Sequence, residues 1–114
     1  MAYDEELAER IREVVDGEEA LSEQRMFGGL AFLIAGNMAV AASGQGGLMV
    51  RVDPEKSDAL VDGLGVEPMV MRGREMLGWL RVTSDAVRDD VALREWVGRG
   101  VSYARSLPPK PSRS

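Results

Sequence analysis

The chain contains no cysteine and no histidine. Without cysteine it has no disulfide bond and no thiol nucleophile, and this composition is typical of a reducing compartment. Without histidine it lacks the commonest general base and the commonest metal ligand of proteins. The N-terminus is acidic where a secretory signal would be basic, so we expect a cytoplasmic protein. We also expect that it carries no metal and no cofactor.

Basic charge is scarce at the N-terminus, and acidic charge is concentrated there. Residues 1–24 carry nine acidic and two basic side chains, whereas residues 25–114 carry ten acidic and twelve basic ones. The net charge of −5 repels phosphate, and no predicted helix is basic along its length. We therefore expect no specific binding of the isolated protein to duplex DNA.

The longest stretch without an acidic residue spans residues 26–52 and consists mainly of apolar residues and glycine. Its uncharged part approaches the roughly 20 residues of a membrane-spanning helix. Glycine and asparagine nevertheless divide it into pieces of strand length, and they tolerate the positive φ of tight turns. No basic cluster flanks it. We predict no membrane segment but a three-stranded antiparallel meander with strands Met26–Ile34, Met38–Ala42 and Leu48–Val52.

Helix patterns flank the meander, and a second hairpin follows it. Apolar residues at spacings of three and four predict the first and last helices, and Asp53-Pro54 is a typical helix start. Gly78, in the middle of a strand, indicates that a neighbouring element packs closely over it. An acidic connection, Glu18–Gln24, precedes the meander. The other expected elements are helices Tyr3–Val15, Asp53–Val61 and Val91–Leu107 and strands Val66–Met71 and Glu75–Val82.

These elements predict a single α+β domain over residues 1–109. Its sheet is antiparallel, its element order is α-β-β-β-α-β-β-α, and its helices lie against one face. Two apolar stripes carry Trp79 and Trp96, so we expect both tryptophans to border one core. A proline pair ends the last helix, and residues 110–114 are expected to form a disordered tail.

Several segments together resemble the N-terminal domain of the TfoX competence-regulator family. Each is short, but their order and spacing cover most of the chain. The segments are Arg25–Phe32 (RMFGGLAF), Gly36–Ala39 (GNMA), Leu48–Val52 (LMVRV), Gly73–Trp79 (GREMLGW), Trp96-Val97 and Tyr103–Pro108 (YARSLP).

The resemblance implies a fold similar to secretion chaperones and a link to transcriptional regulation of DNA uptake. Full-length TfoX proteins carry a second, helical domain where this sequence has a proline-rich tail. The resemblance therefore implies a stand-alone N-terminal domain that acts as a non-enzymatic regulatory or protein-binding module. The alternative is a small-molecule-binding domain or an unrecognised enzyme that uses carboxylates and arginine.

Candidate catalytic groups have simpler structural explanations. Ser43 has no histidine to activate it, and Gly44–Gly47 lacks the lysine and the helix that would follow in a phosphate loop. Adjacent acids such as Asp89-Asp90 usually cap a helix rather than bind a metal. Glu67 and Glu75 flank the second hairpin, where solvated strand ends explain them as well as an acid/base pair. We expect no enzymatic activity.

Four arginines, a tryptophan and a methionine form the candidate binding set: Arg51, Arg72, Arg74, Arg81, Trp79 and Met49. Strand alternation places Trp79 and Arg81 on one face. If that face is open, it can bind an anion or an acidic partner protein. In the alternative, Trp79 belongs to the core and the arginines reach from it to solvent.

The number of helices bears on self-association. Three helices do not cover both faces of a five-stranded sheet, and a face with methionine, tryptophan and arginine is typical of an interface. We therefore expect a homodimer through the face of Met49 and Arg51, with an unidentified partner protein as a further ligand. In the competing arrangement Met49 and Trp79 lie under a helix and the protein is a monomer.

Overall fold

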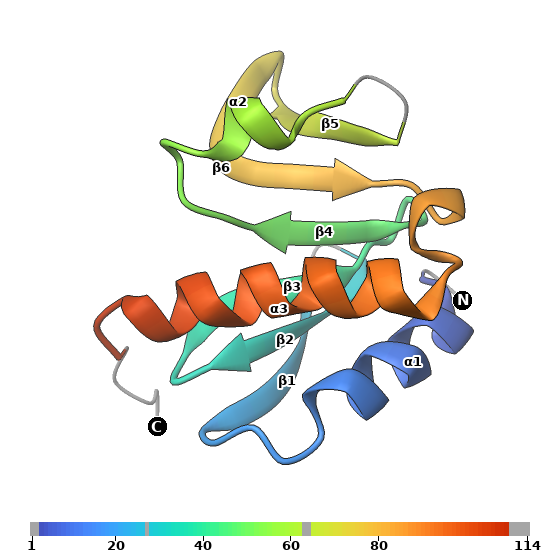
Figure 1. Ribbon diagram of the computed structural model, residues 1–114, viewed down its shortest axis with the longest axis vertical. Coiled ribbons are helices and arrows are strands. Elements are labelled where there is room, and N and C mark those ends of the chain that lie inside the picture. Colours follow the sequence, from blue (N-terminus) through green and yellow to red (C-terminus); the bar gives the residue numbers. More distant parts are fainter. Residues whose placement is uncertain (1–2, 27, 63–64, 110–114) are drawn as a thin grey trace.

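The computed structural model describes residues 3–26, 28–62 and 65–109. Its centre is one six-stranded, fully antiparallel sheet with the strand order β1-β2-β3-β4-β6-β5. Helices α1 and α3 pack on one face of this sheet, and α2 lies beside the β5–β6 hairpin (Figure 1). The elements are α1 (Glu5–Val15), β1 (Leu21–Met26), β2 (Gly29–Ile34), β3 (Asn37–Ala42), β4 (Leu48–Arg51), α2 (Ser57–Leu60), β5 (Val66–Met71), β6 (Arg74–Val82), a 3-10 turn (Asp85–Val87) and α3 (Asp90–Ser106).

The α+β class and the single antiparallel sheet are confirmed, and the predicted succession of elements is present with one strand added. That strand is β1, where the sequence predicted a connection at Glu18–Gln24. It pairs along its whole length with β2, from Leu21 opposite Ile34 to Met26 opposite Gly29. Four of its six side chains are exposed, so backbone pairing rather than burial makes this segment a strand.

The helices begin at acidic caps. The carboxylate of Asp4 accepts a hydrogen bond from the Leu7 N–H, and that of Asp89 accepts one from the Val91 N–H. The α2 helix is shorter than predicted, because Asp53 Oδ1 accepts a hydrogen bond from the Glu55 N–H and holds residues 53–56 in turns. The predicted tail at residues 110–114 lies outside the described residues.

The main core lies between the sheet and helices α1 and α3. Alternate residues of the strands supply one side of it, and the buried stripe of each helix supplies the other. Gly100 allows α3 to touch β3, because a Cβ at this position would lie 2.4 Å from the Ala39 carbonyl oxygen. The described helices include none long and apolar enough to cross a membrane.

The second hairpin has the predicted strands and an irregular middle. Its pairing shifts between Pro68 and Met69, so that Leu77–Trp79 have no direct partners on β5. Gly78 adopts φ +83°, and a Cβ there would lie 2.9 Å from the Val52 carbonyl oxygen. The close packing predicted at this glycine is confirmed.

The end of α3 is attached to the β2–β3 turn and to the connection between α1 and β1. The side-chain amide of buried Asn37, at the β2–β3 turn, donates a hydrogen bond of 2.9 Å to the Pro108 carbonyl oxygen. The Arg105 guanidinium also pairs with the carboxylate of Glu18 in the α1–β1 connection. These contacts hold the last turn of α3 from two sides.

Candidate binding surfaces

The sheet face opposite α1 and α3, termed here the helix-free face, carries a second apolar cluster. Strand residues build it, with Met26, Met69 and Trp79 packed against its buried members, which are Ala31, Leu33, Met38, Ala41 and Met49. Trp96 borders the main core instead. The expectation that both tryptophans border one core is therefore wrong, because strand alternation sends Trp79 to the helix-free face.

Pairing of β4 with β6 brings four of the six candidate residues together. Met49 lies opposite Arg81, and Arg51 lies opposite Trp79. The Arg51 guanidinium carbon is 5.1 Å from the centroid of the Trp79 ring and 5.7 Å from that of Tyr103. Arg51 therefore makes cation–π contacts with two rings, at the boundary between the helix-free face and α3.

Arg81 borders a hollow in the helix-free face. The hollow has a volume of about 250 Å³, and its lining includes Met26, Met49, Met69, Val70 and Arg81. Arg81 lies opposite Glu67 on β5, and its Nη2 donates a long hydrogen bond of 3.5 Å to the Gly46 carbonyl oxygen. Methionine lines both sides of this hollow, and its flexible side chain adapts to different neighbours.

The other two candidate residues, Arg72 and Arg74, lie apart from this face at the turn of the β5–β6 hairpin. Both are exposed, and Arg72 holds the turn with φ +53°. The hairpin also carries exposed apolar side chains, with Leu77 68% and Val70 57% exposed and Met76 at the margin of exposure. We term residues 70–77 the hairpin tip.

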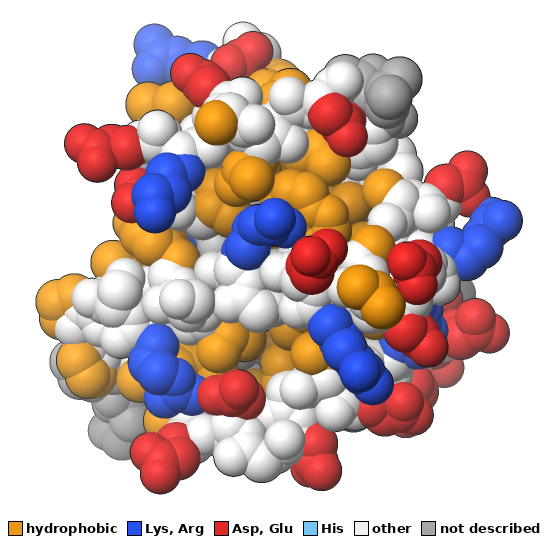
Figure 2. All heavy atoms as spheres, in the orientation of Figure 1, with side chains coloured by type: hydrophobic (Ala, Val, Ile, Leu, Met, Phe, Trp, Pro, Cys, Tyr) orange, Lys and Arg blue, Asp and Glu red, His pale blue; other side chains and the backbone are white. Residues whose placement is uncertain are grey.

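A cleft between α2 and α3 is the larger hollow on the helix-covered side. It has a volume of about 710 Å³, and its lining includes Val52, Lys56, Leu60, Arg99, Ser102 and Tyr103. Apolar side chains are visible in the hollow between α2 and α3, with basic side chains at its border (Figure 2). Sequence reasoning missed this cleft, because no local pattern links residues 52–60 with residues 98–106.

The strongest charge contact lies away from these surfaces. The Arg12 guanidinium donates to both carboxylate oxygens of Glu23, at 2.7 and 2.9 Å, and also pairs with Glu9. The hydrogen bonds from Arg12 hold the pKa of Glu23 below its usual value, and the carboxylates raise the pKa of Arg12. This pair joins α1 to β1 and adds to the backbone pairing with β2 that holds this edge strand.

Asp89, Asp90 and Ser43, which were weighed as catalytic groups, have structural partners. Asp89 caps α3, and Asp90 pairs with Arg10 at 2.9 Å. The Ser43 hydroxyl accepts a hydrogen bond from the Gln45 N–H within the β3–β4 turn. The described residues include no group of three or more acidic side chains placed to hold a metal ion. The helix-cap and hairpin-turn interpretations of these residues are confirmed.

Comparison with known proteins agrees with the resemblance carried by the MFGG, LMVRV and GW segments. The TfoX N-terminal domain family matches residues 13–104, a region that includes all six strands. No curated protein and no solved structure matches the chain. The family match supports a TfoX-like regulatory module, and the family is not a known enzyme family. The chain belongs to the TfoX N-terminal domain family.

Proposed function

We propose that the protein is a non-enzymatic regulatory module that binds an acidic segment of a partner protein through the hairpin tip and the adjoining helix-free face. One observation carries this proposal. Among the described residues, three of the four exposed large hydrophobic side chains lie in the hairpin tip beside Arg72 and Arg74, namely Val70, Met76 and Leu77. Apolar side chains and arginine together are typical of the centre of protein interfaces.

Charge favours an acidic partner at this surface. Arg51, Arg72, Arg74 and Arg81 lie on the tip and the helix-free face, whereas the acidic residues there are Glu67 and Glu75. The region is therefore locally positive in a chain whose net charge is −5. Complementary charge accelerates association and selects among partners more than it raises affinity.

Paired variants test the surface. Partners would be captured from host lysate with the wild type and with two tip variants, Arg72→Glu/Arg74→Glu and Leu77→Ser. The control is Arg94→Glu, at an exposed position of α3. A captured protein would then be purified and its binding measured by calorimetry at two salt concentrations. We expect the tip variants to lose binding, the control to keep it, and salt to weaken it. Unchanged binding by both tip variants would refute the proposal.

A second copy of the chain competes with a different protein as the partner of this surface, and the homodimer stays a prediction. Sedimentation at micromolar concentration tests it, since a single species near 12.4 kDa would reject the dimer. Met49 is only 7% exposed in the single chain, so it offers little area to a second copy. Leu77→Glu is therefore the better variant for separating two copies without unfolding them.

The regulated process is proposed by family likeness alone. A role in the transcriptional regulation of DNA uptake predicts that deleting the gene in its host changes transcript levels of the uptake genes. Complementation with the wild type should restore those levels, and complementation with Arg72→Glu/Arg74→Glu should not. Unchanged transcript levels after deletion would reject this role. They would not affect the proposed binding surface, which the paired variants test separately.

A further inference from the structure

We infer that the α2–α3 cleft binds a small organic anion, a carboxylate or phosphate attached to an apolar body. The cleft lies on the helix-covered side of the sheet, and none of the residues that line it belongs to the hairpin tip or to the helix-free face, so this site is distinct from the proposed protein interface. Its volume of about 710 Å³ is within the range of roughly 300–1,000 Å³ typical of small-molecule sites.

The interior of the cleft is apolar. Val52, which is 3% exposed, forms part of its lining, and half-buried Leu60 of α2 and Tyr103 of α3 contribute on either side. Leu60 also packs against the main core, so its position is fixed by burial. An apolar ligand body placed here would remove its own surface and that of these side chains from water.

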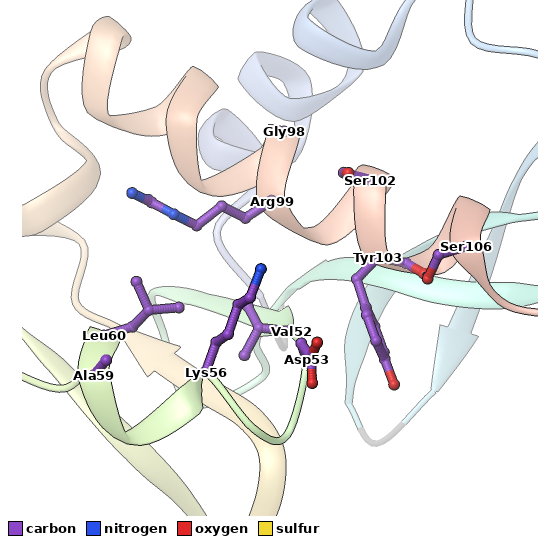
Figure 3. A pocket seen from close by; sticks show the side chains of 10 residues that line it. All are labelled: Val52, Asp53, Lys56, Ala59, Leu60, Gly98, Arg99, Ser102, Tyr103 and Ser106. Atoms are coloured by element: carbon purple, nitrogen blue, oxygen red, sulfur yellow. The ribbon is translucent and has the colours of Figure 1, made fainter.

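Two cations stand at the border of the cleft. Lys56 projects from the turn before α2 and Arg99 from α3, on opposite sides of the space (Figure 3). In the part of the chain that the structure describes, neither forms an ion pair, and the Arg99 guanidinium carbon lies 4.5 Å from the centroid of the Trp96 ring. The lining therefore holds two basic side chains, Lys56 and Arg99, against one carboxylate, Asp53, and its balance of charge is positive.

The acidic residue of the cleft is engaged locally. Asp53 Oδ1 accepts a hydrogen bond from the Glu55 N–H and so shapes the turn that presents Lys56. Arg51 does not line the cleft, but its guanidinium carbon lies 5.7 Å from the centroid of the Tyr103 ring and adds a further positive charge nearby. In a chain of net charge −5, this balance selects an anionic ligand.

Charge also distinguishes among possible occupants. Residues 110–114 contain Lys110 and Arg113 and no acidic side chain, so this segment does not complement the cleft. Acidic side chains of a second copy would complement it, and they are the occupant to be tested against a small anion. The apolar interior favours the small ligand, because its body can enter the space between the two helices.

Two dyes that differ in one charge test the site. Anilinonaphthalene sulfonate has an apolar body with a sulfonate, and N-phenyl-1-naphthylamine has the same rings without the charge. We expect the sulfonate to bind with a fluorescence increase and the neutral dye to bind about tenfold more weakly. The Lys56→Gln/Arg99→Gln variant should bind the sulfonate about tenfold more weakly than the wild type does. The control Arg72→Gln/Arg74→Gln should match the wild type.

Nuclear magnetic resonance on the wild type locates the dye without relying on a variant. We expect the sulfonate to shift amide resonances of residues 52–60 and 98–106. Shifts confined to residues of the helix-free face would overturn the inference, and so would equal dye binding by the Lys56→Gln/Arg99→Gln variant. The inference would also be overturned if the resonances of residues 52–60 shifted with protein concentration and not with dye concentration, because a second copy of the chain would then occupy the cleft.

Discussion

Replacing Gly100 by alanine would place a methyl group against the backbone of the sheet. The added Cβ would lie 2.4 Å from the carbonyl oxygen of Ala39 and 2.8 Å from Cγ1 of Val40, closer than side-chain carbons pack. Ala39 belongs to β3, which is hydrogen-bonded between β2 and β4. The helix, rather than the strand, must therefore move.

Two opposing effects set the size of the change. Overpacking of a core costs about 1–3 kcal/mol, and the upper end applies here because the obstacle is backbone. Alanine favours a helix over glycine by about 1 kcal/mol. The variant Gly100→Ala should therefore lose about 2 kcal/mol of unfolding free energy.

The same helix supplies the control. Gly98 is exposed, and a Cβ there would meet nothing within 4 Å, so Gly98→Ala should gain about 1 kcal/mol. Urea unfolding followed by circular dichroism would measure both variants against the wild type. A Gly100→Ala protein at least as stable as the wild type would refute the close approach of α3 to β3.

Other predictions address the helix-free face, pH and nucleic acid. In urea melts, Met49→Glu should lower the unfolding free energy by about 3 kcal/mol or more, because this substitution buries a charge. Leu77→Glu at the exposed hairpin tip should change the unfolding free energy by less than about 0.5 kcal/mol. Because Arg12 lowers the pKa of Glu23, their contact contributes fully above the usual glutamate pKa of about 4.3 and is lost as pH falls through the lowered value. The stability difference between wild type and Glu23→Gln should therefore shrink between pH 7 and pH 3, and a constant difference would contradict the assignment. Fluorescence anisotropy with labelled duplex DNA at physiological salt should show no specific binding by the isolated protein, and saturable preference for one sequence would reverse this expectation.

The sequence predicted most of the fold where local patterns are strong. The two strand patterns Val66–Met71 and Glu75–Val82 located the β5–β6 hairpin, and Asp89 located the start of α3. The pattern failed at Leu21–Met26, where polar side chains hide a strand whose pairing partner lies further along the chain. Edge strands of this kind lack an alternating apolar signal because neither face is fully buried.

The candidate site was predictable only in part for a related reason. Alternation along strands correctly grouped Trp79 with Arg81, and register then placed Met49 and Arg51 beside them. The corresponding signal for Lys56 and Arg99 does not exist, because their proximity depends on how α2 and α3 pack. Exposure at Leu77 likewise depends on the shifted pairing of the hairpin, which the sequence reveals only through Gly78.

The attachment of α3 through Asn37 has a consequence for how the cleft responds to a ligand. Helix ends commonly fray, yet the turn that carries Tyr103 is held by the Asn37–Pro108 hydrogen bond and by the Arg105–Glu18 pair. This wall of the cleft is preorganised, so a ligand loses little entropy in ordering it. The opposite wall is α2, a single turn of four residues. Ligand-induced protection from amide hydrogen exchange should therefore concentrate in residues 57–61, while α3 amides exchange slowly with or without ligand.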